Sequence, residues 1–117
     1  MTFANPNVWG SSGWVLMHCI ANTYPESPTP AEKTHYFRFF DSLKNVLPCK
    51  LCRKHYNEWL EMFPIRKYLG TRQQLKDWVF RLHNYVNQRL QKKLVPNCES
   101  SDKTIMKFAI KNQAFKK

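Results

Sequence analysis

Residues 71–93 read TRQQLKDWVFRLHNYVNQRLQKK and form the longest uninterrupted helical pattern in the chain. Thr71, with Gln74 three positions later, has the form of a capping box at the start of a helix. The apolar residues that follow recur every three or four positions, which places them on one helix face. They are Leu75, Val79, Leu82, Val86 and Leu90. We predict a helix from Thr71 to about Lys93, with Pro96 beyond its end.

A first helix is predicted upstream, roughly from Val8 to Asn22. It carries residues with three- and four-residue spacing at Trp14, Met17, His18 and Ala21. Residues 24–30 then contain three prolines in seven positions. Proline lacks a backbone N–H and disrupts a helix interior, so this stretch is predicted to be a loop.

A second helix is predicted to begin after Thr29, because Thr29, Pro30 and Glu32 supply an N-cap, a first-turn proline and a capping-box acid. It ends at Pro48, which can also open a third helix with Cys49 and Cys52 in its first turn. The second helix has a broad apolar face made of Tyr36, Phe37, Phe39, Phe40, Leu43 and Leu47.

A short fifth helix, capped by Ser100 or Ser101, would bury Ile105, Phe108 and Ala109. The chain has only three glycines and no run of useful length in which apolar and polar residues alternate, so strands are not predicted. The predicted fold class is therefore all-α, a four-helix bundle with a short fifth helix. A chain of 117 residues is predicted to form a single domain, 1–117, with a core of about residues 8–113.

The chain is strongly basic, with 19 Lys and Arg against 8 Asp and Glu and a formal net charge of +11. These cations are scattered along the chain as solvated helix faces require, so nucleic acid is not the favoured partner. There is no apolar run of membrane-spanning length and no secretory signal pattern. A small basic helical module that binds nucleic acid or an acidic protein is the competing interpretation.

Cys49 and Cys52 form a Cys-x-x-Cys pair, which can be redox-active, metal-binding or structural. A helix N-terminus stabilises a thiolate, and the residues that add cationic character nearby are Lys50, Arg53, Lys54 and His55. Zinc would require these two cysteines, His55 and either His83 or Cys98. No second Cys-x-x-Cys or His-x-x-x-His pair exists, so no metal site is predicted.

Two clusters of side chains could contact a planar cofactor. Trp14 and His18 are four positions apart and share a helix face. His83, Val86, Asn87 and Leu90 share another, and their polar groups need partners if they are buried. A polar cofactor, water or a neighbouring helix would each satisfy them, and core packing explains Trp14 and His18 equally.

Together these residues resemble the Erv/ALR family of FAD-linked sulfhydryl oxidases. Four motifs coincide in order over about residues 9–98. They are Trp9-Gly10 with Trp14 and His18; Tyr24-Pro25; Pro48-Cys49-Lys50-Leu51-Cys52 with His55-Tyr56; and Trp78 with His83-Asn84-Tyr85-Val86-Asn87 and Leu90-Gln91-Lys92.

The resemblance implies FAD at the mouth of the bundle. Cys52 would be the thiol next to the flavin, and Cys49 the outer sulfur that exchanges with substrate thiols. Electrons would pass to oxygen and give hydrogen peroxide. The implied cofactor-binding residues are Gly10, Trp14, His18, Tyr24, Cys52, His55, Trp78, His83, Asn84, Val86, Asn87, Leu90 and Lys92.

The chain also departs from the family pattern. It has no additional shuttle cysteine pair, which implies electrons taken directly from thiol proteins or from a thioredoxin-like carrier. Cys98 could be free or bridged to Cys19, and Phe108 would have to replace the family's aromatic residue in the last helix. The short chain resembles viral members, which implies action in a host cytoplasm or virion. The family also implies a homodimer, to which the aromatic face of the second helix could contribute.

Overall fold

The computed structural model describes residues 1–112, and all its regular elements are helical. Residues 113–117, including the end of the predicted core at residue 113, lie outside the described part. No helix in the described part is long and apolar enough to cross a membrane. The elements are α1 (Pro6–Asn22), α2 (Pro30–Val46), α3 (Lys50–Met62), the 3-10 turn η1 (Ile65–Tyr68), α4 (Arg72–Arg89) and α5 (Cys98–Lys111).

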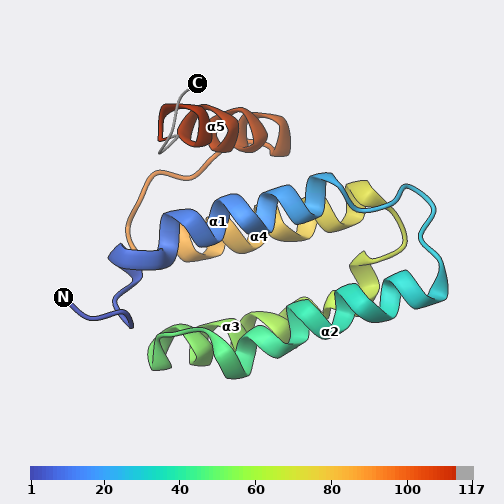
Figure 1. Cartoon of the computed structure of the whole chain (residues 1–117), viewed down its shortest axis with the longest axis horizontal. Helices are drawn as coiled ribbons and strands as arrows, with labels where there is room; N and C mark the ends of the chain where they lie inside the picture. The colour runs from blue at the N-terminus through green and yellow to red at the C-terminus, as the bar shows by residue number, and fades with distance from the viewer. Residues whose placement is uncertain (113–117) are drawn as a thin grey trace.

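The helices pack in two layers with α5 on the outside, which confirms the predicted bundle (Figure 1). α1 lies along α4 in one layer, and α2 lies along α3 in the other. α5 packs on α1 and α4 on the side away from α2 and α3. α3 begins and α4 ends at the same end of the bundle.

Trp78 joins the two layers at the centre of the core. Its side chain is fully buried, and the rings of Phe40, Tyr56 and Trp59 approach it edge-on at centroid distances of 5.4, 6.3 and 6.2 Å. Its indole Nε1–H donates to the Phe63 carbonyl at 2.8 Å. Edge-to-face packing suits the aromatic quadrupoles, and the indole proton has a partner.

The start of α2 agrees with the sequence prediction. The Thr29 hydroxyl accepts from the Glu32 N–H at 3.1 Å, and the Glu32 carboxylate accepts from the Thr29 N–H at 2.8 Å. At α4 the Thr71 hydroxyl caps Gln74 as predicted. The Gln74 side chain, however, accepts from the Gly70 N–H at 2.8 Å, so the reciprocal half of that capping box is not formed.

Three other helix ends differ from the prediction. α1 begins at Pro6, because the Asn5 side chain accepts from Asn7 N–H and caps it. α3 begins at Lys50, with Cys49 as its N-cap residue. α4 ends at Arg89, short of the predicted Lys93, where the chain turns.

α5 also differs from the prediction. Its cap is Asn97, whose side chain accepts from the Ser100 N–H at 2.8 Å, so the predicted serine caps are wrong. Ser101 is 3% exposed and Phe108 is 38% exposed, while Ile105 and Ala109 are half-buried. The prediction that Phe108 is buried is therefore wrong, because the bundle covers mainly the beginning of α5.

Candidate active site

Cys49 and Cys52 lie at the junction between α2 and α3. Cys49 has extended backbone and its Sγ accepts a hydrogen bond from the Cys52 N–H at 3.2 Å. An amide at a helix start has no partner within the helix, so the Cys49 sulfur takes the place of the usual capping oxygen. Cys49, Cys52, Cys19 and Cys98 are all free thiols in this structure, which leaves the suggested Cys19–Cys98 bridge unformed.

The two sulfurs differ in acidity. Burial works against the Cys49 thiolate, but hydrogen bonds from Cys52 and Leu51 and the nearby Arg53 charge outweigh it and lower the pKa of Cys49. Burial, and then the Cys49 sulfur itself, raise the pKa of Cys52. Of the two sulfurs, Cys49 is therefore the one that loses its proton first.

Arg53 also orders this corner. Its guanidinium donates to the carbonyl of Leu47, the residue that ends α2. This contact fixes the short connection that carries Cys49. The sequence indicated only a charge effect for Arg53, because its backbone partner six residues earlier comes close to it only in the folded chain.

An aromatic cluster joins α1 to α4. The Trp14 and His83 rings stack with centroids 3.9 Å apart and planes 7° apart. His18 Nε2 and His83 Nδ1 are 3.0 Å apart, a hydrogen bond in which one nitrogen donates and the other accepts. The structure thus joins His83 of α4 to Trp14 and His18, which the sequence placed together on one face of the first helix.

Both histidines are held neutral. Burial lowers the pKa of His18 to about 4, with Asp102 opposing the shift. Burial also lowers the pKa of His83 to about 4, helped by the charges of His18 and Lys92. A neutral pair can share one hydrogen bond, whereas two imidazolium rings at this distance would repel each other.

Asp102 was not anticipated as part of this region. One carboxylate oxygen accepts from Asn22 at 3.1 Å, and the other pairs with Lys76 at 2.9 Å. These contacts tie α5 to α1 and α4. No sequence pattern indicated them, because the three residues come from three different helices.

Asn87 is a buried amide next to this cluster along α4. It is 9% exposed, its side chain forms no hydrogen bond within residues 1–112, and its amide atoms remain in contact with solvent. Its carbonyl accepts from the Lys92 N–H at 2.8 Å, while the Gln91 N–H donates to Gln88 at 3.1 Å. This is a Schellman turn, and Gln91 has the positive φ of 56° that it requires.

The Schellman turn reverses the chain directly after α4. Leu90 and Lys92 are therefore exposed at the rim of the bundle. Asn84 has a different contact from the one implied by the resemblance, because its amide makes two hydrogen bonds with the Val95 backbone at 2.8 and 2.9 Å. Asn84 thus anchors the segment between α4 and α5, and Val86 packs half-buried on the core.

Two implied cofactor residues are core residues. Tyr24 and Trp78 are both fully buried, and each donates its polar hydrogen to a backbone carbonyl, that of Leu69 or Phe63. Side chains with no accessible surface cannot touch a ligand without rearrangement. We therefore assign both to packing.

Gly10 and His55 occupy more open positions. A Cβ at Gly10 would meet only Pro6, at 3.9 Å, so that stretch of α1 leaves room beside it. His55 is half-buried one turn after Cys52, and burial, followed by the Arg89 charge, lowers its pKa. Arg89 pairs with Glu58 at 3.7 Å, which places the second half of α3 beside the end of α4.

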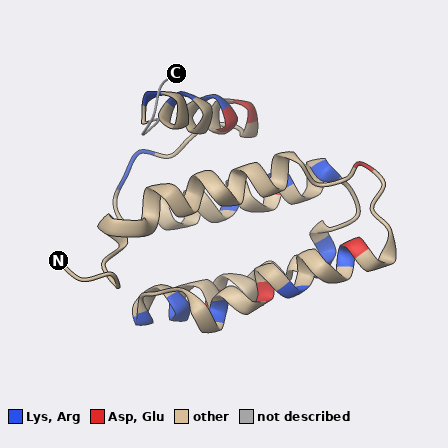
Figure 2. Cartoon of the chain, viewed as in Figure 1, with Lys and Arg blue, Asp and Glu red and all other residues tan. Residues whose placement is uncertain are grey.

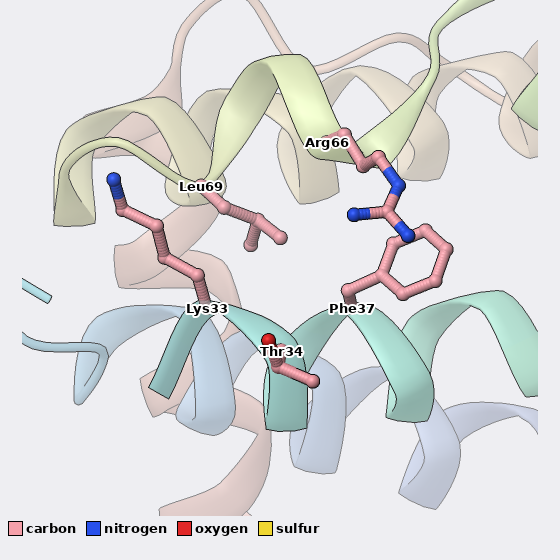
Figure 3. A pocket seen from close by; sticks show the side chains of 5 residues that line it. All are labelled: Lys33, Thr34, Phe37, Arg66 and Leu69. Carbon is pink, nitrogen blue, oxygen red and sulfur yellow. The ribbon is translucent and has the colours of Figure 1, made fainter. Parts of the chain in front are cut away.

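The described residues do not gather three metal-binding side chains anywhere. The zinc arrangement considered for Cys49, Cys52 and His55 is therefore not formed. A separate hollow of about 110 Å³ lies between α2 and η1, with Lys33 at one side and Arg66, stacked on Phe37 at 3.7 Å, at the other (Figure 3). It lies apart from the cysteine pair.

The site fits a flavin dinucleotide in the chemistry of its donors. The stacked Trp14 and His83 rings supply aromatic surface for a planar heterocycle, and the unpartnered Asn87 amide can pair with its polar edge. Lys92 at the rim supplies positive charge suited to a diphosphate. The Cys49/Cys52 pair lies at the start of α3, at the end of the bundle where α4 ends (Figure 1).

Comparisons with known proteins converge on one family. The Erv1 / Alr family model matches residues 11–110. A relative from Acanthamoeba polyphaga mimivirus, named a probable FAD-linked sulfhydryl oxidase, is 38% identical over 92 residues, which is 78% of this chain and 64% of that protein. The mitochondrial FAD-linked sulfhydryl oxidase of Schizosaccharomyces pombe is 29% identical over 86% of this chain and 54% of that protein. The chain thus spans between about half and two thirds of the length of these relatives.

Solved structures agree. The yeast Erv1 core superposes with a TM-score of 0.75 at 27% identity, covering 81% of this chain and 78% of that chain. The FAD binding domain of Erv1 from Saccharomyces cerevisiae gives 0.72 at 29% identity, covering 77% and 83%. The chain is also similar to the FAD-linked sulfhydryl oxidase of African swine fever virus, with 31% identity over 74% of this chain and 71% of that protein.

Proposed function

The chain belongs to the Erv1/Alr family, and we propose that it is an FAD-dependent thiol oxidase that forms disulfides in proteins through Cys49 and Cys52. One observation carries the proposal. The two sulfurs of unequal acidity lie at the start of α3, at the end of the bundle where α4 ends, and α4 also carries His83, whose ring stacks on Trp14. A thiol pair and an aromatic surface suited to a planar cofactor thus occur in one helical bundle.

In the oxidised enzyme Cys49 and Cys52 form a disulfide. A substrate thiolate attacks the Cys49 sulfur, so a mixed disulfide forms and the Cys49–Cys52 bond breaks, releasing Cys52 as a thiolate that takes a proton. A second substrate thiolate then attacks the substrate sulfur and expels Cys49. The substrate has lost two electrons and two protons, and the Cys49/Cys52 pair has gained them.

The acidity of Cys49 suits its place in this sequence. Thiol exchange is faster when the departing sulfur has a low pKa. Cys49 departs in the second step, and its hydrogen bond from the Cys52 N–H together with the Arg53 charge lowers its pKa. Cys52, with a raised pKa, retains its proton until it is reoxidised.

Trp14, His18, His83, Asn87 and Lys92 would hold the cofactor. Bound FAD would supply the two-electron acceptor that regenerates the Cys49–Cys52 disulfide, with oxygen as the final acceptor and hydrogen peroxide as the product. The neutral His18–His83 pair offers hydrogen bonds without adding charge, and the Trp14 ring excludes water from one face of His83.

We further propose thiol proteins, or a thioredoxin-like carrier, as electron donors, and a homodimer as the working state. The exposed Phe39 on the aromatic face of α2 is available for a dimer contact. Relatives in mimivirus and African swine fever virus support a viral role, in a host cytoplasm or a virion. Disulfides in a reducing compartment require a dedicated oxidant.

The experiment is oxygen consumption with dithiothreitol by the purified yellow protein. Cys49→Ser and Cys52→Ser should each abolish turnover while the flavin absorbance remains, and Cys19→Ser, on the exposed side of α1, should keep most activity. A colourless protein, or full turnover by both active-site variants, would refute the proposal.

A further inference from the structure

The surface around Cys49 carries concentrated positive charge. Lys50, Arg53 and Lys54 all lie in the first five residues of α3, and that first turn contains no acidic residue. Figure 2 shows Lys and Arg gathered where α2 ends and α3 begins. We call Lys50, Arg53 and Lys54 the basic rim.

Helix stability does not account for the basic rim. Cations are unfavourable near a helix N-terminus, by roughly 0.3–1 kcal/mol each at the surface. α2 and α5 follow the favourable pattern, with Glu32 and Glu99 in their first turns and a lysine in their last. α3 has the reverse arrangement at the end that carries the cysteines.

Ion pairing within the chain does not account for it either. Lys50 and Lys54 are exposed, and neither belongs to an ion pair within residues 1–112. The nearest acids are engaged elsewhere, since Asp41 pairs with Lys44 at 3.1 Å and Glu58 pairs with Arg89. The charges of Lys50 and Lys54 are therefore directed to solvent, while Arg53 is held against the Leu47 carbonyl.

Two apolar side chains accompany these charges. Leu51, between the two cysteines, is 59% exposed, and Val46, at the end of α2, is 62% exposed. The surface that surrounds the outer sulfur thus combines a small apolar contact with unpaired cations, which is how a docking surface for an acidic chain segment is built.

We propose that this surface selects thiol proteins whose exchanging cysteine lies in an acidic segment with an apolar residue beside it. The inference rests on the proposed function. The basic rim attracts the segment and draws its thiolate toward Cys49, while Leu51 and Val46 contact the apolar residue. The exchange step itself is unchanged, with the substrate sulfur bonding to Cys49 as the bond to Cys52 breaks.

The first test measures binding and does not depend on flavin chemistry. Two fluorescent peptides share one sequence with serine in place of cysteine, flanked either by Asp and Glu or by Lys. We expect the acidic peptide to bind at least about tenfold more tightly at low salt, a preference that falls as salt screens the charges. Equal binding of the two peptides would overturn the inference, as would tighter binding of a single-stranded oligonucleotide of equal charge.

The second test locates the effect with charge reversal. The Lys50→Glu/Lys54→Glu variant should lose the preference, while Lys33→Glu/Lys107→Glu, with the same change in net charge at exposed sites away from the cysteines, should keep it. Equal loss in both variants would assign the effect to net charge and contradict a docking surface.

The third test measures turnover, with two thiols in each peptide so that both peptides can serve as substrates. The kcat/KM of the wild-type protein should favour the acidic peptide, and in Lys50→Glu/Lys54→Glu the ratio of kcat/KM between the acidic and the basic peptide should fall to about one. Absence of dithiothreitol oxidation by the wild-type protein would refute the proposed function, whereas the binding comparison tests the inference separately. If Lys50→Glu/Lys54→Glu kept the preference for the acidic peptide, the inference would be refuted while the proposed function would stand.

Discussion

Trp14 and His83 lie face to face across α1 and α4, with 3.9 Å between ring centroids. An aromatic pair of this kind contributes about 0.5–1.5 kcal/mol beyond the area it buries. Removing the indole should therefore weaken FAD binding both by lost contact and by freeing the His83 ring. Trp14→Ala should raise the Kd for FAD at least about threefold, and Trp14→Phe should raise it less.

The measurement is flavin absorbance per protein after gel filtration, together with titration of the stripped protein with FAD. Leu16→Ala is the matched control, because Leu16 is on the same helix and 56% exposed. Equal flavin retention by Trp14→Ala and Leu16→Ala would remove Trp14 from the site.

The His18–His83 pair should make the free energy of unfolding depend on pH. Burial is the main cause that lowers both pKa values to about 4, whereas an unfolded chain titrates its histidines near about 6.5. Between these values the unfolded chain binds more protons than the folded one. The free energy of unfolding should therefore be at its full value above about pH 6.5 and fall as the pH drops toward 4.

Thermal melts followed by circular dichroism across this range give the test. His18→Gln should reduce the slope of Tm against pH, and His35→Gln, at an exposed site on α2, should leave it unchanged. A Tm of the wild-type protein that stays flat from pH 6.5 to 4 would contradict the buried neutral pair.

Local signals predicted the helices well. The start of α2 is determined by Thr29, Pro30 and Glu32, which lie within four positions of one another. The observed cap uses the contacts that this pattern predicts. The predicted end of α4 at Lys93 was wrong because the chain turns at Gln91, which has a positive φ. Glycine or asparagine usually marks such a turn in a sequence, and neither occupies position 91. Cap signals lie within a few residues, whereas this turn is stabilised by the segment that Asn84 anchors.

The site was predictable as a set of residues and unpredictable as an arrangement. His18 and His83 are 65 positions apart, so their hydrogen bond exists only once α1 packs on α4. Tyr24 and Trp78 were assigned to the cofactor because the resemblance to the Erv/ALR family implied it, whereas in the fold both donate their polar hydrogens to backbone carbonyls. No pattern in the sequence identifies those carbonyls.

Trp59 should tolerate loss of its indole nitrogen. It is 3% exposed, and its Nε1 has no hydrogen-bond partner in the described part of the chain. A buried donor without a partner costs about 1–3 kcal/mol, so Trp59→Phe removes a penalty along with some packing against Phe63 and Tyr85. We expect a change in unfolding free energy below about 1 kcal/mol.

Trp78→Phe is the matched comparison, because that indole donates to the Phe63 carbonyl and leaves it unpaired when removed. It should cost about 2 kcal/mol or more in urea denaturation. Equal losses for the two variants would mean that the Trp59 nitrogen has a partner after all.

Replacement of Gln91 by glycine should increase the stability of the fold. Its φ of 56° lies in the left-handed region, where a Cβ costs roughly 1–2 kcal/mol that glycine avoids, although glycine also gains freedom in the unfolded chain. Gln91→Gly should therefore stabilise the fold by about 0.5–1 kcal/mol, whereas Gln91→Ala, which keeps the Cβ, should not. The Lys92 N–H would remain on the Asn87 carbonyl, so FAD retention should be unchanged in both variants. Denaturant midpoints measured side by side provide the comparison, and a glycine variant no more stable than the alanine variant would show that the turn is not strained.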